Sequence, residues 1–387
     1  MSVATEVALG EVASIVRTTV EPDEIANGTC YVGLDNIVSR GGLTDVRPVA
    51  SGDLASTKLV FTNREVLFGK LRPYLAKIAR PDFGGVCSTD ILPIRPGNDL
   101  DRDYLAHYLA FPPTVALAAQ RATGANLPRL SPNQLKRFTL PLPSLEEQRR
   151  VARVLDMADA LREKRRRCLR YLHALIAAIY TDLFQGEWRQ YQLGDVLDRI
   201  DSGSSPVCET RPASGAEWGV LKLGAISFGR YDPGANKALL PGCAPRPADE
   251  VRAGDILLAR KNTRELVGAS VLVHDTPDRL MLPDLIFRLV PAEDAPLDAA
   301  YLQATLAQPR SRAAIARLAG GSAGSMPNIS KARLRSIEVD VPPIERQQSY
   351  AERSQQVELI RQRAQAHLAH LDALFACLQA RAFAGDL

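Results

Sequence analysis

The sequence predicts a mixed α/β fold in which two related globular domains are separated by two long helices that pair as an antiparallel coiled coil with pseudo-two-fold symmetry. Three observations predict this. One helical segment occurs twice at a constant offset of 199 residues, short strand patterns fill the regions outside it, and those regions match each other loosely. The expected parts are two globular domains, residues 1–142 and 187–341, and two spacer helices, residues 143–186 and 342–387.

Both globular regions contain short apolar runs separated by Gly, Pro, Asp and Asn, a pattern typical of strands and turns. Strands are expected at Val66–Phe68 and Ile256–Leu258, and helical stretches around Tyr104–Ala119 and Tyr301–Leu318. Each region therefore combines strands with a helical part near its end.

The two globular regions match with an offset that grows along the chain. Leu9 matches Leu193 at 184 residues, Val66 matches Ile256 at 190, and Tyr104 matches Tyr301 at 197, before the helices match at 199. Small insertions thus accumulate in the second domain and stop where the helix begins. Duplication explains this arrangement better than chance.

Each repeated segment has the boundaries of one long helix. Ser144 after Pro143 and three residues before Glu147 indicates a capped start, and Gly186 and Gly385 are natural helix stops. Forty residues at 1.5 Å each give a helix of roughly 60 Å.

Apolar residues recur along both helices in alternating steps of three and four, which predicts a seam for a partner helix. The other copy is the favoured partner, and the alternative is that each helix covers its own domain. The residues expected in pairing and subunit docking are Leu155, Arg162, Leu172, Ile176, Val357, Arg361, Leu371 and Phe375. The seam positions also include Arg162, Arg165 and Arg361, and arginine is unusual in a seam. The middle of the helix pair therefore either faces anionic groups or opens to water.

Composition fits an ordinary globular protein of two or three domains, with 387 residues, 46% hydrophobic and 24% charged. The net charge of +4 permits a polyanionic partner without requiring one. The six cysteines form no CxxC pair, so neither a disulfide framework nor a metal cluster is expected. With no signal-peptide pattern and no membrane-length apolar run, we expect a cytoplasmic protein without a membrane partner.

The segments that lead into the helices carry a family resemblance. Leu140–Gln148 (LPLPSLEEQ) and Val339–Gln347 (VDVPPIERQ) resemble the P-L-P-x-x-E-Q helix start of DNA-specificity (S) subunits of type I restriction-modification systems. The preceding loops, Gly124–Ser131 and Gly321–Ser330, resemble the loop of that family, and Gly254–Asn262 resembles part of its target-recognition domains. The resemblance covers nearly the whole chain, twice over.

The resemblance implies that each globular region is a target-recognition domain that reads one half of a split sequence in double-stranded DNA. It implies that the helices set a fixed spacer between the halves. It also implies that two modification methyltransferase subunits dock on the chain and that endonuclease–translocase subunits can join them. A non-catalytic subunit without cofactors is expected, because the sequence has no methyltransferase Asn-Pro-Pro-Tyr-type tetrapeptide, Gly-rich nucleotide loop or Walker lysine.

DNA recognition requires cations for phosphates and forked or amide side chains for base edges. Two loops that follow matching strands carry such residues, and the loops before the helices add Arg129 and Asn328. The candidates are Arg64, Lys70, Arg72, Tyr74, Lys77 and Arg129 in the first domain, and Arg260, Lys261, Asn262, Arg264 and Asn328 in the second. The alternative for each cluster is a solvated basic loop.

Other conspicuous residues have simpler explanations. The Arg165–Arg167 run is more typical of a solvated helix face than of a phosphate contact. His367 and His370 lack further metal ligands, and Trp188 and Trp218 are expected in the domain cores. The main rival function is a structural adaptor that links proteins through its helices without binding DNA. An enzyme with an unrecognised nuclease or transferase site is a third hypothesis.

Overall fold

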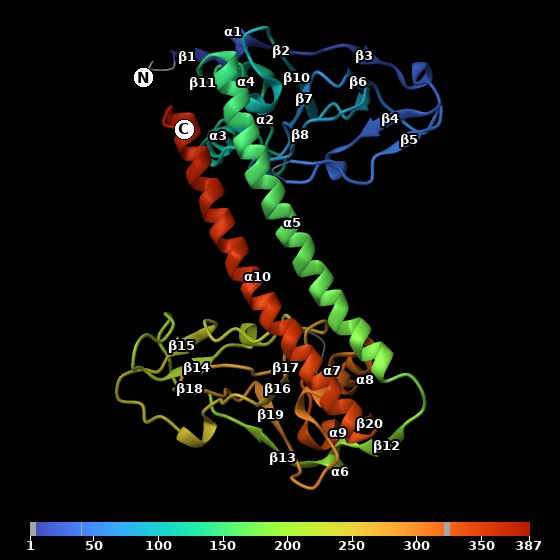
Figure 1. Ribbon diagram of the computed structural model, residues 1–387, viewed down its shortest axis with the longest axis vertical. Coiled ribbons are helices and arrows are strands. Elements are labelled where there is room, and N and C mark those ends of the chain that lie inside the picture. The colour runs from blue at the N-terminus through green and yellow to red at the C-terminus, as the bar shows by residue number, and fades with distance from the viewer. Residues whose placement is uncertain (1–4, 40, 321–325) are drawn as a thin grey trace. The chain divides into compact units, whose positions relative to one another are not determined.

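The computed structural model describes residues 5–39, 41–320 and 326–387, and the chain divides into two compact units (Figure 1). Unit 1 comprises Met1–Cys168 and Ala364–Leu387, and unit 2 comprises Leu169–Arg363. Each long helix therefore contributes one segment to each unit. Gly321 and Ser322, which carry part of the resemblance in the second domain, lie outside the described residues.

Among its described residues, unit 1 holds three sheets and four short helices beside its segments of the long helices. The strands are β1 (Thr5–Ala8), β2 (Ala13–Ile15), β3 (Thr19–Val20), β4 (Thr29–Val32), β5 (Arg47–Val49), β6 (Lys58–Phe61), β7 (Val66–Gly69), β8 (Ile78–Ala79), β9 (Gly85–Cys87), β10 (Ile91–Pro96) and β11 (Thr139–Leu142). The helices are α1 (Leu9–Val12), α2 (Arg102–Ala110), α3 (Pro112–Gln120), α4 (Pro132–Leu135) and the long α5 (Leu145–Leu183).

Unit 2 repeats most of this order. Its strands are β12 (Arg189–Gln192), β13 (Leu197–Ser202), β14 (Gly219–Leu221), β15 (Asn236–Ala238), β16 (Ile256–Ala259), β17 (Ser270–Leu272), β18 (Leu280–Met281), β19 (Ile286–Pro291) and β20 (Glu338–Val341). Its helices are α6 (Leu193–Val196), α7 (Ala299–Ala307), α8 (Pro309–Leu318), α9 (Lys331–Arg335) and the long α10 (Ile344–Ala384).

The two units share a four-stranded antiparallel sheet, in the order β2-β10-β7-β8 in unit 1 and β13-β19-β16-β17 in unit 2. The register also corresponds, because Phe68 pairs with Leu92 as Leu258 pairs with Phe287. Each unit also has a two-stranded antiparallel sheet, β1-β11 in unit 1 and β12-β20 in unit 2. The third sheets differ, since unit 1 has the five-stranded order β3-β6-β9-β4-β5 and unit 2 has β15-β14-β18. The mixed α/β fold with two long helices is confirmed, as are the strands expected at Val66–Phe68 and Ile256–Leu258.

The repeated Leu-Gly-acid-Val sequence forms the short helices α1 and α6. Leu9 N donates to Phe138 O and Leu193 N donates to Ile337 O, both at 2.7 Å. A Cβ at Gly10 would lie 3.0 Å from the Cβ of Lys136 in the facing segment. Glycine is therefore required by close packing in unit 1, and Gly194 has the same surroundings in unit 2.

Proline divides the helical stretch expected in each domain. Around Tyr104–Ala119 the chain forms α2 and α3, which meet at Pro112, and around Tyr301–Leu318 it forms α7 and α8, which meet at Pro309. The expected helical stretches are confirmed, and each consists of two helices because proline has no N–H for an internal helical bond and fits the first turn of a new helix.

Within each unit the two long helices run antiparallel. In unit 1 the Phe383 ring near the end of α10 lies 5.4 Å from Tyr104 and 5.0 Å from Phe111, beside the start of α5. In unit 2 the matching Phe184, which follows α5, lies 4.6 Å from Tyr301 and 5.7 Å from Tyr350 on the first turns of α10. The aromatic residue that ends each helix thus packs on the domain from which the other helix begins.

Candidate nucleic-acid interface

A basic loop follows the central strand β7 in unit 1. It comprises residues 70–77 and is named here the first basic loop. Its backbone is hydrogen-bonded to the segment that precedes α4: Arg72 N donates to Pro128 O at 2.7 Å, and Leu130 N donates to Lys70 O at 2.9 Å. An isolated bridge joins Leu71 to Arg129. The first basic loop and the loop that carries Arg129 are therefore neighbours.

Unit 2 has the same construction after β16. Residues 260–264, the second basic loop, are bonded to the segment before α9: Ile329 N donates to Arg260 O at 2.8 Å and Asn262 N donates to Pro327 O at 3.3 Å. Lys261 forms the isolated bridge to Asn328. The same backbone pairing therefore occurs in both domains although their sequences differ. It belongs to the fold that the two domains have in common.

Three side chains of the first basic loop are accessible. Arg72 is exposed, Tyr74 is 53% exposed and Lys70 is half-buried. Arg72 has φ of 49°, a left-handed conformation that is uncommon outside glycine and is concentrated at functional sites. It precedes the 3-10 turn Pro73–Leu75, which presents Tyr74 to solvent.

Lys77 and Arg64 differ from their neighbours in the candidate set. The Lys77 ammonium donates to Leu34 O at 2.6 Å and to Ile37 O at 3.1 Å, so it anchors the fold. Arg64 is exposed but precedes β7, at the opposite end of that strand from Lys70. At about 3.3 Å per residue, a four-residue strand separates the two by more than 10 Å.

Arg129 is held by a bidentate ion pair. Its Nε donates to Asp90 Oδ1 at 2.9 Å and its Nη2 donates to Asp90 Oδ2 at 3.2 Å, although 45% of the side chain is exposed. Bidentate geometry orients the guanidinium. The exposed part of Arg129 lies beside the first basic loop, because Arg129 is bridged to Leu71.

The second basic loop has two structural and two accessible candidates. The Arg260 guanidinium lies 5.1 Å from the Phe287 ring centroid, and its Nε donates to Asn328 Oδ1 at 3.1 Å. Asn262 is only 6% exposed and donates from Nδ2 to Ser227 Oγ at 3.1 Å. Lys261 is half-buried and Arg264 is exposed. The last two are the side chains that can reach a ligand without breaking an internal contact.

Two glutamines missed as functional candidates join each long helix to its domain. Gln148 and Gln347 are fully buried. Gln148 Nε2 donates to Asp99 O at 2.9 Å and to Pro143 O at 2.8 Å, while its Oε1 accepts from Asp101 N at 2.8 Å. Gln347 makes the three equivalent bonds in unit 2. The repeat identified these residues, but their role depends on contacts some fifty residues away.

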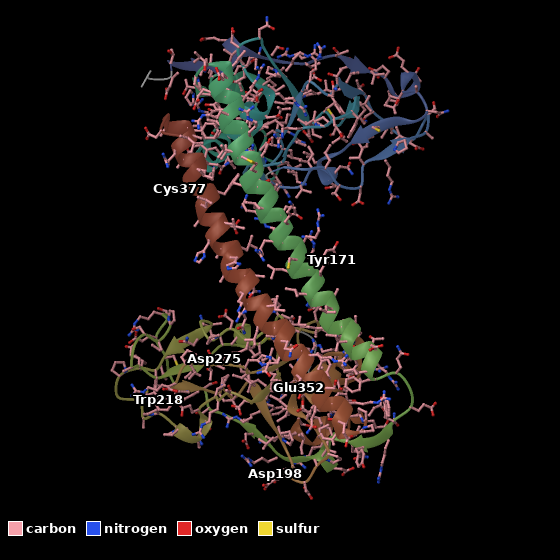
Figure 2. All side chains as sticks on the ribbon, in the orientation of Figure 1. Tyr171, Asp198, Trp218, Asp275, Glu352 and Cys377 are labelled. Atoms are coloured by element: carbon pink, nitrogen blue, oxygen red, sulfur yellow. The ribbon has the colours of Figure 1, made fainter. Side chains whose placement is uncertain are left out.

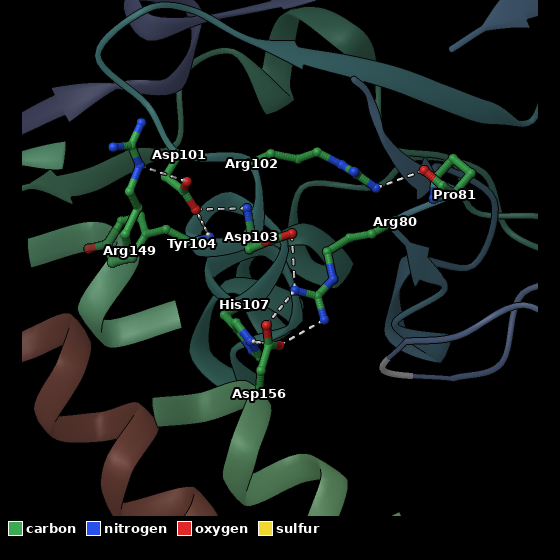
Figure 3. A network of polar contacts seen from close by, with 9 residues as sticks. All are labelled: Arg80, Pro81, Asp101, Arg102, Asp103, Tyr104, His107, Arg149 and Asp156. Atoms are coloured by element: carbon green, nitrogen blue, oxygen red, sulfur yellow. Dashed lines mark hydrogen bonds and ion pairs between the residues drawn. The ribbon is translucent and has the colours of Figure 1, made fainter. Parts of the chain in front are cut away.

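A polar network in unit 1 connects α5 with the domain (Figure 3). His107 Nε2 lies 2.8 Å from Asp156 Oδ1, and Arg80 bridges Asp156 at 2.8 Å and Asp103 at 3.1 Å. Burial opposes ionisation of Asp156, but hydrogen bonds from His107 and Arg80 outweigh it and lower the pKa of Asp156 to about 2. The network holds the first turns of α5 against α2.

The predicted seam residues are all buried or half-buried. Leu155, Arg162 and Val357 are buried. The half-buried members are Leu172, Ile176, Arg361, Leu371 and Phe375. The arginines face carboxylates of the chain itself, since Arg162 pairs with Asp159 and Asp372, and Arg361 pairs with Glu358.

In the part of the chain that the structure describes, no three His, Cys, Asp or Glu side chains cluster in a way that could hold a metal ion, and His367 and His370 are exposed. Over the same residues, no helix combines the length and apolar character needed to cross a membrane.

Comparisons with known proteins agree with this architecture. The specificity subunit of the type I restriction enzyme EcoEI from Escherichia coli is 34% identical over 157 residues, which cover 40% of this chain and 26% of that relative. The EcoKI specificity subunit from Escherichia coli (strain K12) is 22% identical over 330 residues, 79% of this chain and 69% of the relative.

The type I restriction-modification system S subunit from M. genitalium has the same fold, with a TM-score of 0.65 and 14% identity over 98% of this chain and 96% of that one. The family model described as type I restriction modification DNA specificity domain matches residues 5–167. The resemblance found in the sequence is thereby confirmed for residues 5–167, which match the model of the type I restriction modification DNA specificity domain.

Proposed function

We propose that the chain is the non-catalytic DNA-specificity subunit of a type I restriction-modification complex and that it reads a bipartite target in double-stranded DNA. The observation that carries the proposal is the pairing of a basic loop with the segment before α4 in unit 1 and before α9 in unit 2. This pairing brings together, in both units, side chains suited to phosphates and bases. Lys70, Arg72, Tyr74 and Arg129 serve one half-site, and Lys261 and Arg264 serve the other.

The test is selection of DNA duplexes from a random library by the purified chain, alone and with its methyltransferase subunits, at two salt concentrations. The expected result is enrichment of two short motifs at a fixed separation, with affinity that falls as salt rises. A structural adaptor enriches no sequence at either salt concentration. Turnover by the chain alone, with metal or S-adenosylmethionine, would support the enzyme hypothesis.

The long helices set the length of the unread spacer. Their lengths of 39 and 41 residues and their matching seams support this role, because a heptad repeat tolerates removal only of whole heptads. Deleting residues 162–168 together with the equivalent residues 361–367 shortens both helices by about 10 Å and preserves each seam. The separation of the selected motifs should decrease.

A matched control keeps the length and changes the charge: Arg165, Arg166 and Arg167 are all replaced by Gln. The motif separation should then stay unchanged, although affinity can fall through lost phosphate contacts. An unchanged separation after the double deletion would contradict the spacer role while leaving DNA recognition intact.

Methyltransferase subunits dock on exposed apolar residues of the long helices. Leu161 and Leu175 on α5 are 51% and 45% exposed, and the equivalent Ile360 and Leu374 on α10 are both 50% exposed. In each pair the residues are two heptads apart and share one helix face. Repetition of the surface in both helices supports two methyltransferase subunits, which endonuclease–translocase subunits can join.

Another exposed apolar residue, Tyr171 on α5, is 68% exposed and lies on the same face as Leu175, four residues along the helix (Figure 2). Replacing Leu161 and Ile360 with Asp should abolish co-purification of the methyltransferase subunits, because a carboxylate cannot be buried in an apolar interface. The exposed Gln355→Asp serves as the control and should leave assembly unchanged.

A further inference from the structure

An exposed apolar side chain lies beside the basic loop in each unit. Phe228 is 75% exposed in unit 2, and Val38 is 47% exposed in unit 1. Both follow a 3-10 turn, Leu223–Ala225 or Leu34–Asn36, and both come shortly after a fully buried isoleucine. Neither residue was selected from the sequence, which gives no signal that distinguishes a presented apolar residue from a buried one.

In unit 2 hydrogen bonds of the preceding residue hold the Phe228 backbone next to the second basic loop. The preceding Ser227 is only 7% exposed. Its Oγ donates to Leu223 O at 2.6 Å and accepts from Asn262 Nδ2 at 3.1 Å. The buried amide of Asn262 therefore ties the residue before Phe228 to the second basic loop.

In unit 1 different bonds produce the same juxtaposition. Ser39, which follows Val38, donates from Oγ to Leu75 O at 2.7 Å, and it forms an isolated bridge to Lys77. Lys77 in turn donates to Ile37 O. Val38 is thus tied on both sides to the first basic loop. Each unit thus holds an exposed apolar residue beside its basic loop through its own set of hydrogen bonds, although the two residues are one position apart when counted from the 3-10 turn, which indicates a shared use.

We propose that Phe228 and Val38 are specificity-determining residues that contact the C5-methyl group of a thymine in the major groove, one in each half-site. This inference rests on the proposed DNA-binding function. Among the groups that base pairs present in the grooves, the thymine methyl is the apolar one, and it distinguishes A·T from T·A. An apolar side chain on a fixed backbone beside cations that bind phosphate can reach it without deforming the duplex.

Insertion of the ring between base pairs is a different mechanism with a different cost. A wedge must unstack a base step and kinks the DNA. Val38, beside the basic loop of unit 1, is short for that purpose, whereas both valine and phenylalanine can cover a methyl group. The recurrence in both units therefore favours the methyl contact, and the difference in size fits two domains that read different sequences.

The test combines a protein substitution with removal of one methyl group from DNA. Duplexes selected by the full-length chain are resynthesised with deoxyuridine in place of each thymine in turn. For the native chain, one replacement in one half-site should weaken binding about four-fold, the effect of one buried methyl-sized group. Phe228→Ala should weaken binding to the unmodified duplex and abolish the difference between thymine and deoxyuridine at that position. Val38→Ala should act in the other half-site.

Val207→Ala is the matched control, because Val207 is a 68% exposed apolar residue of unit 2. It should retain the native response to deoxyuridine. The inference is overturned if Phe228→Ala binds like the native chain, if it weakens binding while no thymine methyl matters, or if it impairs only methyltransferase assembly. Selection of half-sites without thymine also overturns it and leaves the proposed function standing. Failure to select any sequence contradicts the proposed function itself.

Discussion

Arg162 Nε donates to Asp372 Oδ1 at 2.6 Å, and this bond joins the two long helices inside unit 1. The guanidinium also bonds Asp159 at 2.6 Å and lies 4.2 Å from the Phe375 ring centroid. Only 10% of the Arg162 side chain is exposed. An arginine that interrupts an apolar seam is thus accommodated by two carboxylates and an aromatic face, which offset the cost of removing its charge from water.

Substitution of Arg162 should destabilise the chain more than substitution of its repeat equivalent. Arg162→Ala is expected to lower the free energy of unfolding by about 2 kcal/mol, because a buried cation and its packing are lost. Arg361→Ala should cost about 0.5 kcal/mol, since Arg361 pairs with Glu358 on its own helix. Urea unfolding of both variants measures the difference. A double-mutant cycle with Asp372→Asn should show coupling for Arg162, and additive effects would contradict the assignment.

The buried glutamines should be essential for attaching the helices. Gln148→Leu is expected to cost about 2–3 kcal/mol, because the backbone groups of Asp99, Asp101 and Pro143 lose their partners in a buried site. Thermal unfolding of the full chain measures the loss. The exposed Gln355→Leu is the control and should change stability by less than about 0.5 kcal/mol. Equal effects of the two substitutions would show that Gln148 has no such role.

Much of the fold could be predicted because the repeat is present twice. The helix boundaries agree with α5 and α10 to within a few residues: Ser144 Oγ accepts from Glu147 N at 3.3 Å, and Gly186 and Gly385 have φ of 116° and 81°. Local chemistry determines these features. The sheets β3-β6-β9-β4-β5 and β15-β14-β18 could not be predicted. Their strands are short, and several pair with strands far along the chain.

The candidate site was only partly predictable, because the sequence shows which loops correspond but does not show which of their side chains face solvent. The Lys70–Tyr74 and Arg260–Arg264 loops follow equivalent strands, so their correspondence was visible in the sequence. Whether a polar side chain faces solvent depends on contacts made by distant residues. Asn262 bonds Ser227 and Lys77 bonds Leu34, and neither contact leaves a sequence pattern.

Replacing the exposed Arg72 should impair DNA binding, whereas replacing the hydrogen-bonded Lys77 should impair thermal stability. Arg72→Ala is expected to weaken DNA binding about ten-fold without lowering Tm, because its side chain is exposed beside the proposed interface. Lys77→Ala should lower Tm, since two carbonyl oxygens lose their donor, at about 1 kcal/mol each. Binding by fluorescence anisotropy and unfolding by circular dichroism separate the two effects. Unaltered DNA binding by Arg72→Ala would remove this residue from the interface.

The Asp156 network should give a stability that depends on pH. Its pKa is lowered from 3.8 to about 2 in the folded chain, so the stabilisation is fully present above about pH 4 and is lost as the pH falls towards 2. Asp156→Asn should therefore lower stability by roughly 1 kcal/mol at pH 7, because more than a third of the side chain is exposed and the pairing is screened. The difference from the native chain should narrow between pH 4 and pH 2, as measured by urea unfolding. A gap that stays constant over this range would contradict the ion pairing.

The most direct test of the central claim is a methylome comparison of cells that carry the gene with cells from which it has been deleted. The account predicts that deletion removes methylation at a single target with two specified parts and an unspecified spacer of constant length. Restoring the gene with the paired heptad deletions should change that spacer and leave both specified parts intact. An identical methylome with and without the gene, or a target without a spacer, would contradict the account.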